Sequence, residues 1–157
     1  MSQPVILASA SEARAEMLRA AGVDVVVEPA RVDEDAVKAA LRAEGAPPRD
    51  QADKLAEMKA IRVSSRRPGA LVIGADQVLE LDGEAFDKPA GIDEARAQLN
   101  RLRGQRHELH AAAAIAVNGA PVWRHVARAR LFMRGFSADY LEAYLARMGA
   151  AVTTTVG

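Results

Sequence analysis

The run from Ala70 to Ala75 constrains the fold of this 157-residue chain more than any other segment. Its residues, Ala-Leu-Val-Ile-Gly-Ala, are small or apolar throughout and show no alternation with polar side chains. Such a run is typical of a strand covered on both faces, as in α/β proteins with helices on each side of a sheet. The run delivers Asp76 at its end, where open α/β sheets place their ligands. We therefore expect an α/β fold with Asp76 near a ligand.

Strand and helix signals alternate along the rest of the chain. Two hairpin turns are predicted, at Asp82-Gly83 and at Asn118-Gly119. We see no repeat, low-complexity tract or linker, which favours a single domain over residues 1–157. The expected strands are 5–8, 23–27, 70–75, 107–117 and 122–133, and the expected helices are 14–21, 36–43, 49–63, 92–103 and 138–148.

Composition excludes several classes of function. The 21 basic side chains are matched by 21 acidic ones, so a broad basic face for polymeric nucleic acid is not expected. The longest apolar run, Ala111–Val117, is far shorter than the roughly 18 residues that span a bilayer. The first residues lack a secretory signal pattern, so we expect a cytoplasmic protein without a membrane partner. The absence of cysteine excludes thiol chemistry and zinc–thiolate sites.

Ser9, Ser11 and Arg14 stand where a strand gives way to a helix. In such a loop, hydroxyl groups and free N–H groups at the helix N-terminus converge, and the helix dipole favours an anion. Arg14 adds a forked cation one turn later. The three residues therefore predict a phosphate site, and the alternative is ordinary helix capping by the serines.

Carboxylates and lysines supply the remaining candidates. If Glu34 faces Asp76, the two carboxylates form an oxygen-rich site for Mg²⁺. The alternatives are that Asp33 and Glu34 only begin a helix and that Asp76 forms an Asx-turn. Lys59 lies on an otherwise apolar helix stripe, and it either joins this site or extends to solvent. Lys88 either joins the site or is an ordinary surface lysine. The three histidines, at positions 107, 110 and 125, lack helical metal-ligand spacing, and we assign no metal to them.

Six short blocks occur in a fixed order between residues 7 and 107. They are Leu7–Arg14 with Met17-Leu18, Asp33-Glu34, Leu55–Ala60, Gly74–Val78, Lys88-Pro89 and Leu102–His107. Their order closely resembles the Maf family of nucleoside triphosphate pyrophosphatases, and the resemblance covers essentially the whole chain. It implies an α/β fold similar to the inosine triphosphatase fold, with a mixed sheet, flanking helices and two lobes around a central cleft.

The resemblance also implies an activity, namely hydrolysis of a nucleoside triphosphate to a monophosphate and pyrophosphate. The implied cofactor is Mg²⁺ or another divalent cation such as Mn²⁺, and the implied assembly is a homodimer. The residues implied as catalytic are Asp76, Glu34, Lys59 and Lys88. Two of these, Asp76 and Glu34, would hold the metal. The residues implied as substrate-binding are Ser9, Ser11, Arg14 and Gln77.

The chain departs from the family pattern in two places. Glu12 and Ala13 stand where the family commonly has Pro and often a second Arg. The family also continues beyond the position of Gly157 into a loop that contributes to the nucleotide site. Because Val152–Gly157 resembles the approach to that loop, we expect a Maf-like domain without its C-terminal portion.

Gln77 indicates the substrate branch. With Gln at this position the chain resembles the branch of the family that acts on 7-methyl-GTP. The branch that acts on dTTP and UTP more often has Thr there. The other readings are a non-catalytic nucleotide-binding regulator of septum formation and a phosphomonoesterase with Asp76 as the nucleophile. The last is disfavoured because Val78 stands where that chemistry usually has a second Asp.

Overall fold

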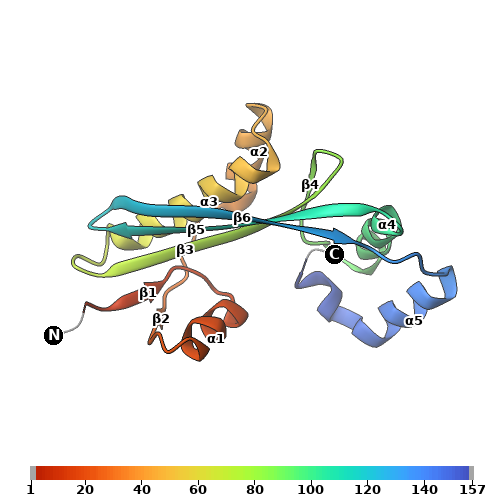
Figure 1. Ribbon diagram of the computed structural model, residues 1–157, viewed down its shortest axis with the longest axis horizontal. Helices are drawn as coiled ribbons and strands as arrows, with labels where there is room; N and C mark the ends of the chain where they lie inside the picture. The colour runs from red at the N-terminus through yellow and green to blue at the C-terminus, as the bar shows by residue number, and fades with distance from the viewer. Residues whose placement is uncertain (1–2, 156–157) are drawn as a thin grey trace. The chain divides into compact units, whose positions relative to one another are not determined.

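The computed structural model describes residues 3–155, which fold as a mixed α/β protein (Figure 1). The described residues form two compact units, one made of residues up to Gln77 with Ala111–Ala127 and the other of Val78–His110 with residues from Arg128 onward. In chain order the elements are β1 (Val5–Leu7), α1 (Glu12–Ala20), β2 (Val26–Val27), α2 (Glu34–Ala43), α3 (Pro48–Ser64), β3 (Leu71–Leu81), β4 (Glu84–Phe86), α4 (Ile92–Leu102), β5 (Arg106–Val117), β6 (Ala120–Phe132), α5 (Ala138–Met148) and η1 (Gly149–Thr153), a 3₁₀-helix.

The sheet is mixed, as the sequence predicts. Its strand order is β2-β1-β3-β5-β6, and β4 pairs with β3 outside this path. Strand β1 runs parallel to both β2 and β3, whereas β4 is antiparallel to β3. In Figure 1, α1 and α3 lie on opposite sides of the sheet in the first unit. Within residues 3–155, none of the helices is long and apolar enough to cross a membrane.

Strand β3 differs from its prediction. The predicted strand 70–75 and the arm of the following hairpin are one strand, so Asp76 lies in its middle and not at its carboxyl end. The strand continues because its backbone finds partners on both sides of Asp76: Leu71–Ile73 pair with β1, and Leu79–Leu81 pair with β4. Both the predicted strand end and the Asx-turn alternative for Asp76 are therefore wrong.

Strand β2 is also shorter than predicted, because it begins at Val26 and not at Val23. The reason lies at the end of α1, where the Val23 N–H donates to the Leu18 carbonyl at 2.9 Å and so completes the helix terminus. The predicted helix ends agree well with the structure elsewhere. Ser137 caps α5 by accepting a hydrogen bond from the Tyr140 N–H at 3.0 Å.

Each unit has its own apolar core. In the first unit, residues of β1 and β3 pack with Val63 of α3. In the second unit, one cluster joins α4 and α5, and another joins the β3–β4 hairpin to Leu102. The predicted single domain thus contains two packing units, each with its own buried residues.

The tip of the β5–β6 hairpin is fixed to the end of α3. Asn118 and Gly119 have φ values of 50° and 78°, as a tight hairpin turn of this sequence requires. The Gly119 N–H donates to the Ser64 hydroxyl at 2.9 Å, and the Asn118 side-chain oxygen accepts from the Gly69 N–H at 2.9 Å. Because Ser64 is fully buried, its hydroxyl is part of the packing between hairpin and helix.

We predict that Ser64→Ala lowers the free energy of unfolding by about 1–3 kcal/mol, because the Gly119 N–H loses its acceptor away from water. Urea denaturation followed by circular dichroism measures the loss. Ser65→Ala is the matched control, since the Ser65 hydroxyl is exposed and donates only to the Ile61 carbonyl. Equal losses in the two variants would contradict the anchoring role of Ser64.

Candidate active site

The loop between β1 and α1 gathers Ser9, Ser11 and Arg14. The Ser11 hydroxyl accepts a hydrogen bond from the Arg14 N–H at 3.4 Å, so Ser11 is the N-cap of α1. The Ser9 hydroxyl accepts from the Ser11 N–H and from Arg14 Nη1, each at 3.2 Å. Arg14 Nη1 also donates to the Ala75 carbonyl at 3.2 Å. Capping is therefore confirmed for Ser11, and Arg14 joins this loop to the middle of β3.

Lys59 lies between two carboxylates. Its ammonium nitrogen is 2.8 Å from Glu34 Oε1 and 3.0 Å from Asp76 Oδ1. It also donates to the Ala75 carbonyl at 3.4 Å, so Lys59 and Arg14 share one acceptor. The side chains of Lys59 and Asp76 are only 8% and 9% exposed. The alternative in which Lys59 extends to solvent is therefore wrong. Glu34 begins α2, as one alternative has it, and it also contacts the same ammonium group as Asp76.

Gly74 allows this arrangement. It lies two residues before Asp76, so both positions face the same side of β3. A Cβ atom on Gly74 would overlap the Ala56 carbonyl oxygen of α3 and would lie 2.6 Å from the Ala60 nitrogen. Helix α3 therefore approaches β3 as closely as backbone allows, and this brings Lys59 within reach of Asp76. Gly74 belongs to the Gly74–Val78 block of the sequence, but the linear pattern does not reveal this close approach.

Burial and the neighbouring cations act on the pKa of Asp76 in opposite directions, and the Glu34 carboxylate adds to the rise that burial causes. Burial raises the pKa of the Asp76 carboxyl group above its ordinary value, and the nearby Lys59 ammonium lowers it by attraction and by its hydrogen bond. The Lys38 ammonium acts in the same direction as Lys59. Sequence analysis missed Lys38, although it lies one helical turn after Glu34 on α2 and so shares its helix face.

The Asp76 carboxylate has an unused ligand atom. Its Oδ2 is buried and makes no hydrogen bond with any residue in the described part of the chain. The Glu34 side chain is 40% exposed and so offers oxygen atoms at the solvent side of the same cluster. Two carboxylates, one with an unpaired buried oxygen, form a donor set that fits a hard divalent cation such as Mg²⁺. Asp33, by contrast, accepts from the Ala36 N–H at 3.1 Å and serves as the N-cap of α2.

Two further site residues were predicted, Gln77 and Lys88. Gln77 follows Asp76 on β3 and its side chain is exposed. Lys88 follows β4 in the second unit, so its place beside the other site residues stays a prediction. The residues that the structure brings together are Ser9, Ser11, Arg14, Glu34, Lys59 and Asp76.

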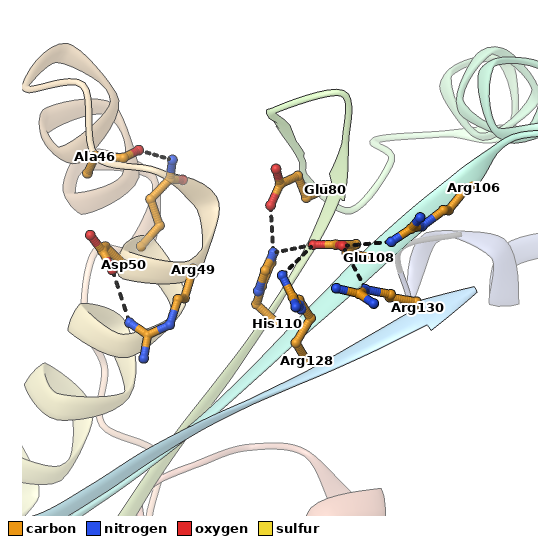
Figure 2. A network of polar contacts seen from close by, with 10 residues as sticks. Ala46, Arg49, Asp50, Glu80, Arg106, Glu108, His110, Arg128 and Arg130 are labelled. Carbon is orange, nitrogen blue, oxygen red and sulfur yellow. Dashed lines mark hydrogen bonds and ion pairs between the residues drawn. The ribbon is translucent and has the colours of Figure 1, made fainter. Parts of the chain in front are cut away.

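The second unit holds a separate polar network around Glu108 (Figure 2). His110 Nε2 lies 2.6 Å from Glu80 Oε2 and 3.7 Å from Glu108 Oε2, and the three side chains have a spacing suitable for a metal ion. Three arginines already surround Glu108 at 3.5–3.9 Å, namely Arg106, Arg128 and Arg130. Their positive charges oppose a further cation, so we assign this network a structural role. Sequence analysis did not find it, because strand pairing creates it.

The sequence matches one protein family and is similar to several named proteins. A family model described as Maf-like protein matches residues 4–155. A protein of Ruegeria pomeroyi named nucleoside triphosphate pyrophosphatase is 51% identical over 157 residues, which cover 100% of this chain and 79% of the relative. A protein of Caulobacter vibrioides with the same name is 53% identical over 154 residues, covering 98% of this chain and 77% of the relative.

A solved structure shows a weaker likeness. It is described as a nucleoside-triphosphatase / dITP/XTP pyrophosphatase from Mycobacterium abscessus, and it covers 98% of this chain and 98% of its own at 15% identity and a TM-score of 0.46. We draw no conclusion about function from similarity at this level.

We predict that Gly74→Ala separates Lys59 from Asp76, because the added methyl group must push α3 away from β3. The free energy of unfolding should fall by about 1–3 kcal/mol, as for other overpacked cores, and triphosphate binding should weaken. Gly135→Ala is the control, since a Cβ there meets no atom within 4 Å. Calorimetric unfolding and triphosphate titration measure both effects, and wild-type values in Gly74→Ala would contradict the close approach.

The raised pKa of Asp76 predicts a pH dependence of stability. A carboxyl group whose pKa is higher in the folded than in the unfolded state binds more protons when folded, so it lowers stability as the pH rises through that interval. Starting from about pH 4, wild type should lose stability relative to Asp76→Asn by about 1.4 kcal/mol for each pH unit between the two pKa values. Parallel curves of unfolding free energy against pH would contradict this.

Proposed function

Because the chain belongs to the Maf family, we propose that it hydrolyses nucleoside triphosphates to nucleoside monophosphates and pyrophosphate. The observation that carries this proposal is the placement of Lys59 between Glu34 and Asp76, with Arg14 on the same Ala75 carbonyl. This arrangement places two cations and two carboxylates at one point of the first unit. Cations of this kind bind phosphate oxygens, and carboxylates activate water.

Asp76 is the proposed base. Its carboxylate orients or deprotonates the water that attacks the α-phosphorus, and Glu34 assists at the solvent side. A buried carboxylate with a raised pKa is better matched to proton abstraction near neutral pH than an exposed one. The phosphomonoesterase alternative would need Asp76 to attack phosphorus itself, and its buried Oδ2 and its ion pair with Lys59 favour the role of base.

The cations of the site bind the triphosphate. Arg14 and the hydroxyl of Ser9 hold phosphate oxygens at the start of α1, and Ser11 fixes this loop as the helix cap. Lys59 and Lys88 stabilise the pyrophosphate leaving group. Positioning and neutralisation of charge supply most of the catalysis in phosphoryl transfer, so side chains of these types suffice without a covalent intermediate.

The proposed cofactor is Mg²⁺, held by Asp76 and Glu34. When bound, such an ion would neutralise charge on the phosphate oxygens and lower the pKa of a bound water. The oxygen-only donor set of this pair favours Mg²⁺ or Mn²⁺ over softer metals.

The proposed substrate is 7-methyl-GTP, and the alternative is dTTP or UTP. Gln77 supports the former through the family resemblance, because the branch that acts on dTTP and UTP more often has Thr at this place. We further propose a homodimer on the family resemblance alone, and a cytoplasmic location on the sequence pattern alone.

A substrate panel tests the activity. We expect pyrophosphate as the first product from 7-methyl-GTP, UTP and dTTP with Mg²⁺, with the highest kcat/KM for 7-methyl-GTP. Asp76→Asn should lower kcat at least about 100-fold, the typical contribution of a general base. Asp50→Asn is the matched control, since Asp50 is exposed and pairs with the neighbouring Arg49.

Three results would contradict the proposal. Inorganic phosphate as the first product would favour the phosphomonoesterase. A triphosphate-induced rise in melting temperature without any product would favour the binding regulator. Comparable turnover by Asp76→Asn and Asp50→Asn would remove Asp76 from the chemistry.

A further inference from the structure

The ammonium group of Lys59 lies in the space between the two proposed metal ligands. It is 2.8 Å from Glu34 Oε1 and 3.0 Å from Asp76 Oδ1, which are hydrogen-bonding distances to both carboxylates. With 8% of its side chain exposed, Lys59 is largely shielded from water there. The two carboxylates are therefore already bridged by a resident positive charge.

A divalent cation and this ammonium group compete for the same oxygens. An ammonium group uses its N–H donors on the lone pairs that a hard cation needs as ligands. Like charges a few ångströms apart also repel strongly, and more so where burial excludes water. Asp76 Oδ2 is free of hydrogen bonds, but an ion bound there and to a Glu34 oxygen would lie within a few ångströms of the Lys59 ammonium group, and this repulsion favours displacement of Lys59.

The surroundings allow such a displacement. The third contact of Lys59, to the Ala75 carbonyl, is the longest of the three at 3.4 Å, and that carbonyl already accepts from Arg14 at 3.2 Å. The Glu34 side chain is 40% exposed, which leaves the cluster open to solvent on the α2 side. Lysine has a flexible four-carbon stem, so its charge can move while the helix stays in place.

We infer that Lys59 is the place-holding cation of the metal-free site, and that it leaves Glu34 and Asp76 when a divalent ion binds. The released ammonium group is then available to the phosphate oxygens of the triphosphate. This inference rests on the proposed function for the choice of Glu34 and Asp76 as ligands. It adds that the free protein holds divalent ions weakly.

Mn²⁺ titration without nucleotide tests the competition. Free Mn²⁺ is measured by electron paramagnetic resonance for wild type, Lys59→Met and Lys54→Met. Lys54 is the matched control, because it lies on the same helix, loses the same charge and contacts Glu57 at 3.2 Å. We expect Lys59→Met to bind Mn²⁺ at least about tenfold more tightly than wild type, and Lys54→Met to stay within about twofold. Equal or weaker binding by Lys59→Met would overturn the inference.

A second readout uses the wild-type protein and does not depend on how Lys59→Met folds. An amine-reactive reagent labels lysines, and mass spectrometry follows Lys59 and Lys54 separately. Saturating Mn²⁺ should raise the labelling rate of Lys59 several-fold, because the amine leaves its two carboxylates, while Lys54 stays constant. An unchanged rate at Lys59 in Mn²⁺-saturated protein would overturn the inference.

Neither measurement requires turnover. Tighter Mn²⁺ binding by Lys59→Met together with an absence of pyrophosphate release would contradict the proposed function and leave this inference standing. Pyrophosphate release by the wild type together with unchanged Mn²⁺ binding by Lys59→Met would support the proposed function and overturn this inference.

Discussion

The buried ion pair between Lys59 and Asp76 is the interaction on which the proposed site depends. Removing one partner of a buried pair leaves an uncompensated charge, which typically costs about 3–5 kcal/mol. The pair therefore requires α3 to lie at one position along β3, with Lys59 opposite Asp76. The missing side chain at Gly74 permits that position, because any Cβ would collide with the backbone of α3. One glycine and one ion pair together set the geometry of the cluster.

Other charged pairs in the structure are different in kind. Arg96 with Glu142 and Arg101 with Glu84 have side chains 34–59% exposed, and such surface pairs contribute little to stability. The 21 basic and 21 acidic residues therefore lie in unlike environments. Surface pairs account for some of them, while the Lys59 cluster holds charge in a place where water is largely excluded. Electrostatic interactions are strongest there, which suits a site that binds a polyanion.

Sequence reasoning predicted local structure better than long-range contacts. Asn118 and Gly119 were assigned to their hairpin turn because the chemistry of that feature lies within a few residues. Asp76 was placed at a strand end because the apolar run stops at Ala75, yet pairing with β1 and β4 carries β3 past this point.

The composition of the site was predictable in part. Lys59 stood out as a charge on an apolar stripe, but its partners lie 17 and 25 positions away, and only the packing of α3 against β3 and α2 brings them together. The shared Ala75 carbonyl was not predicted, since a backbone oxygen leaves no mark in a linear motif, whereas the spacing of Lys38 four residues after Glu34 on one helix could have pointed to it. The family resemblance pointed to the residues that form the cluster, and the structure shows the contacts that join them.

A double-mutant cycle tests most directly the claim that Lys59 and Asp76 act as one unit. Pyrophosphate release would be measured for wild type, Lys59→Met, Asp76→Asn and the double variant, and each kcat/KM would be converted to a free energy. The account predicts strong non-additivity, with the double variant hardly slower than the slower single variant. Losses that simply add would show that the two residues act independently and would contradict it.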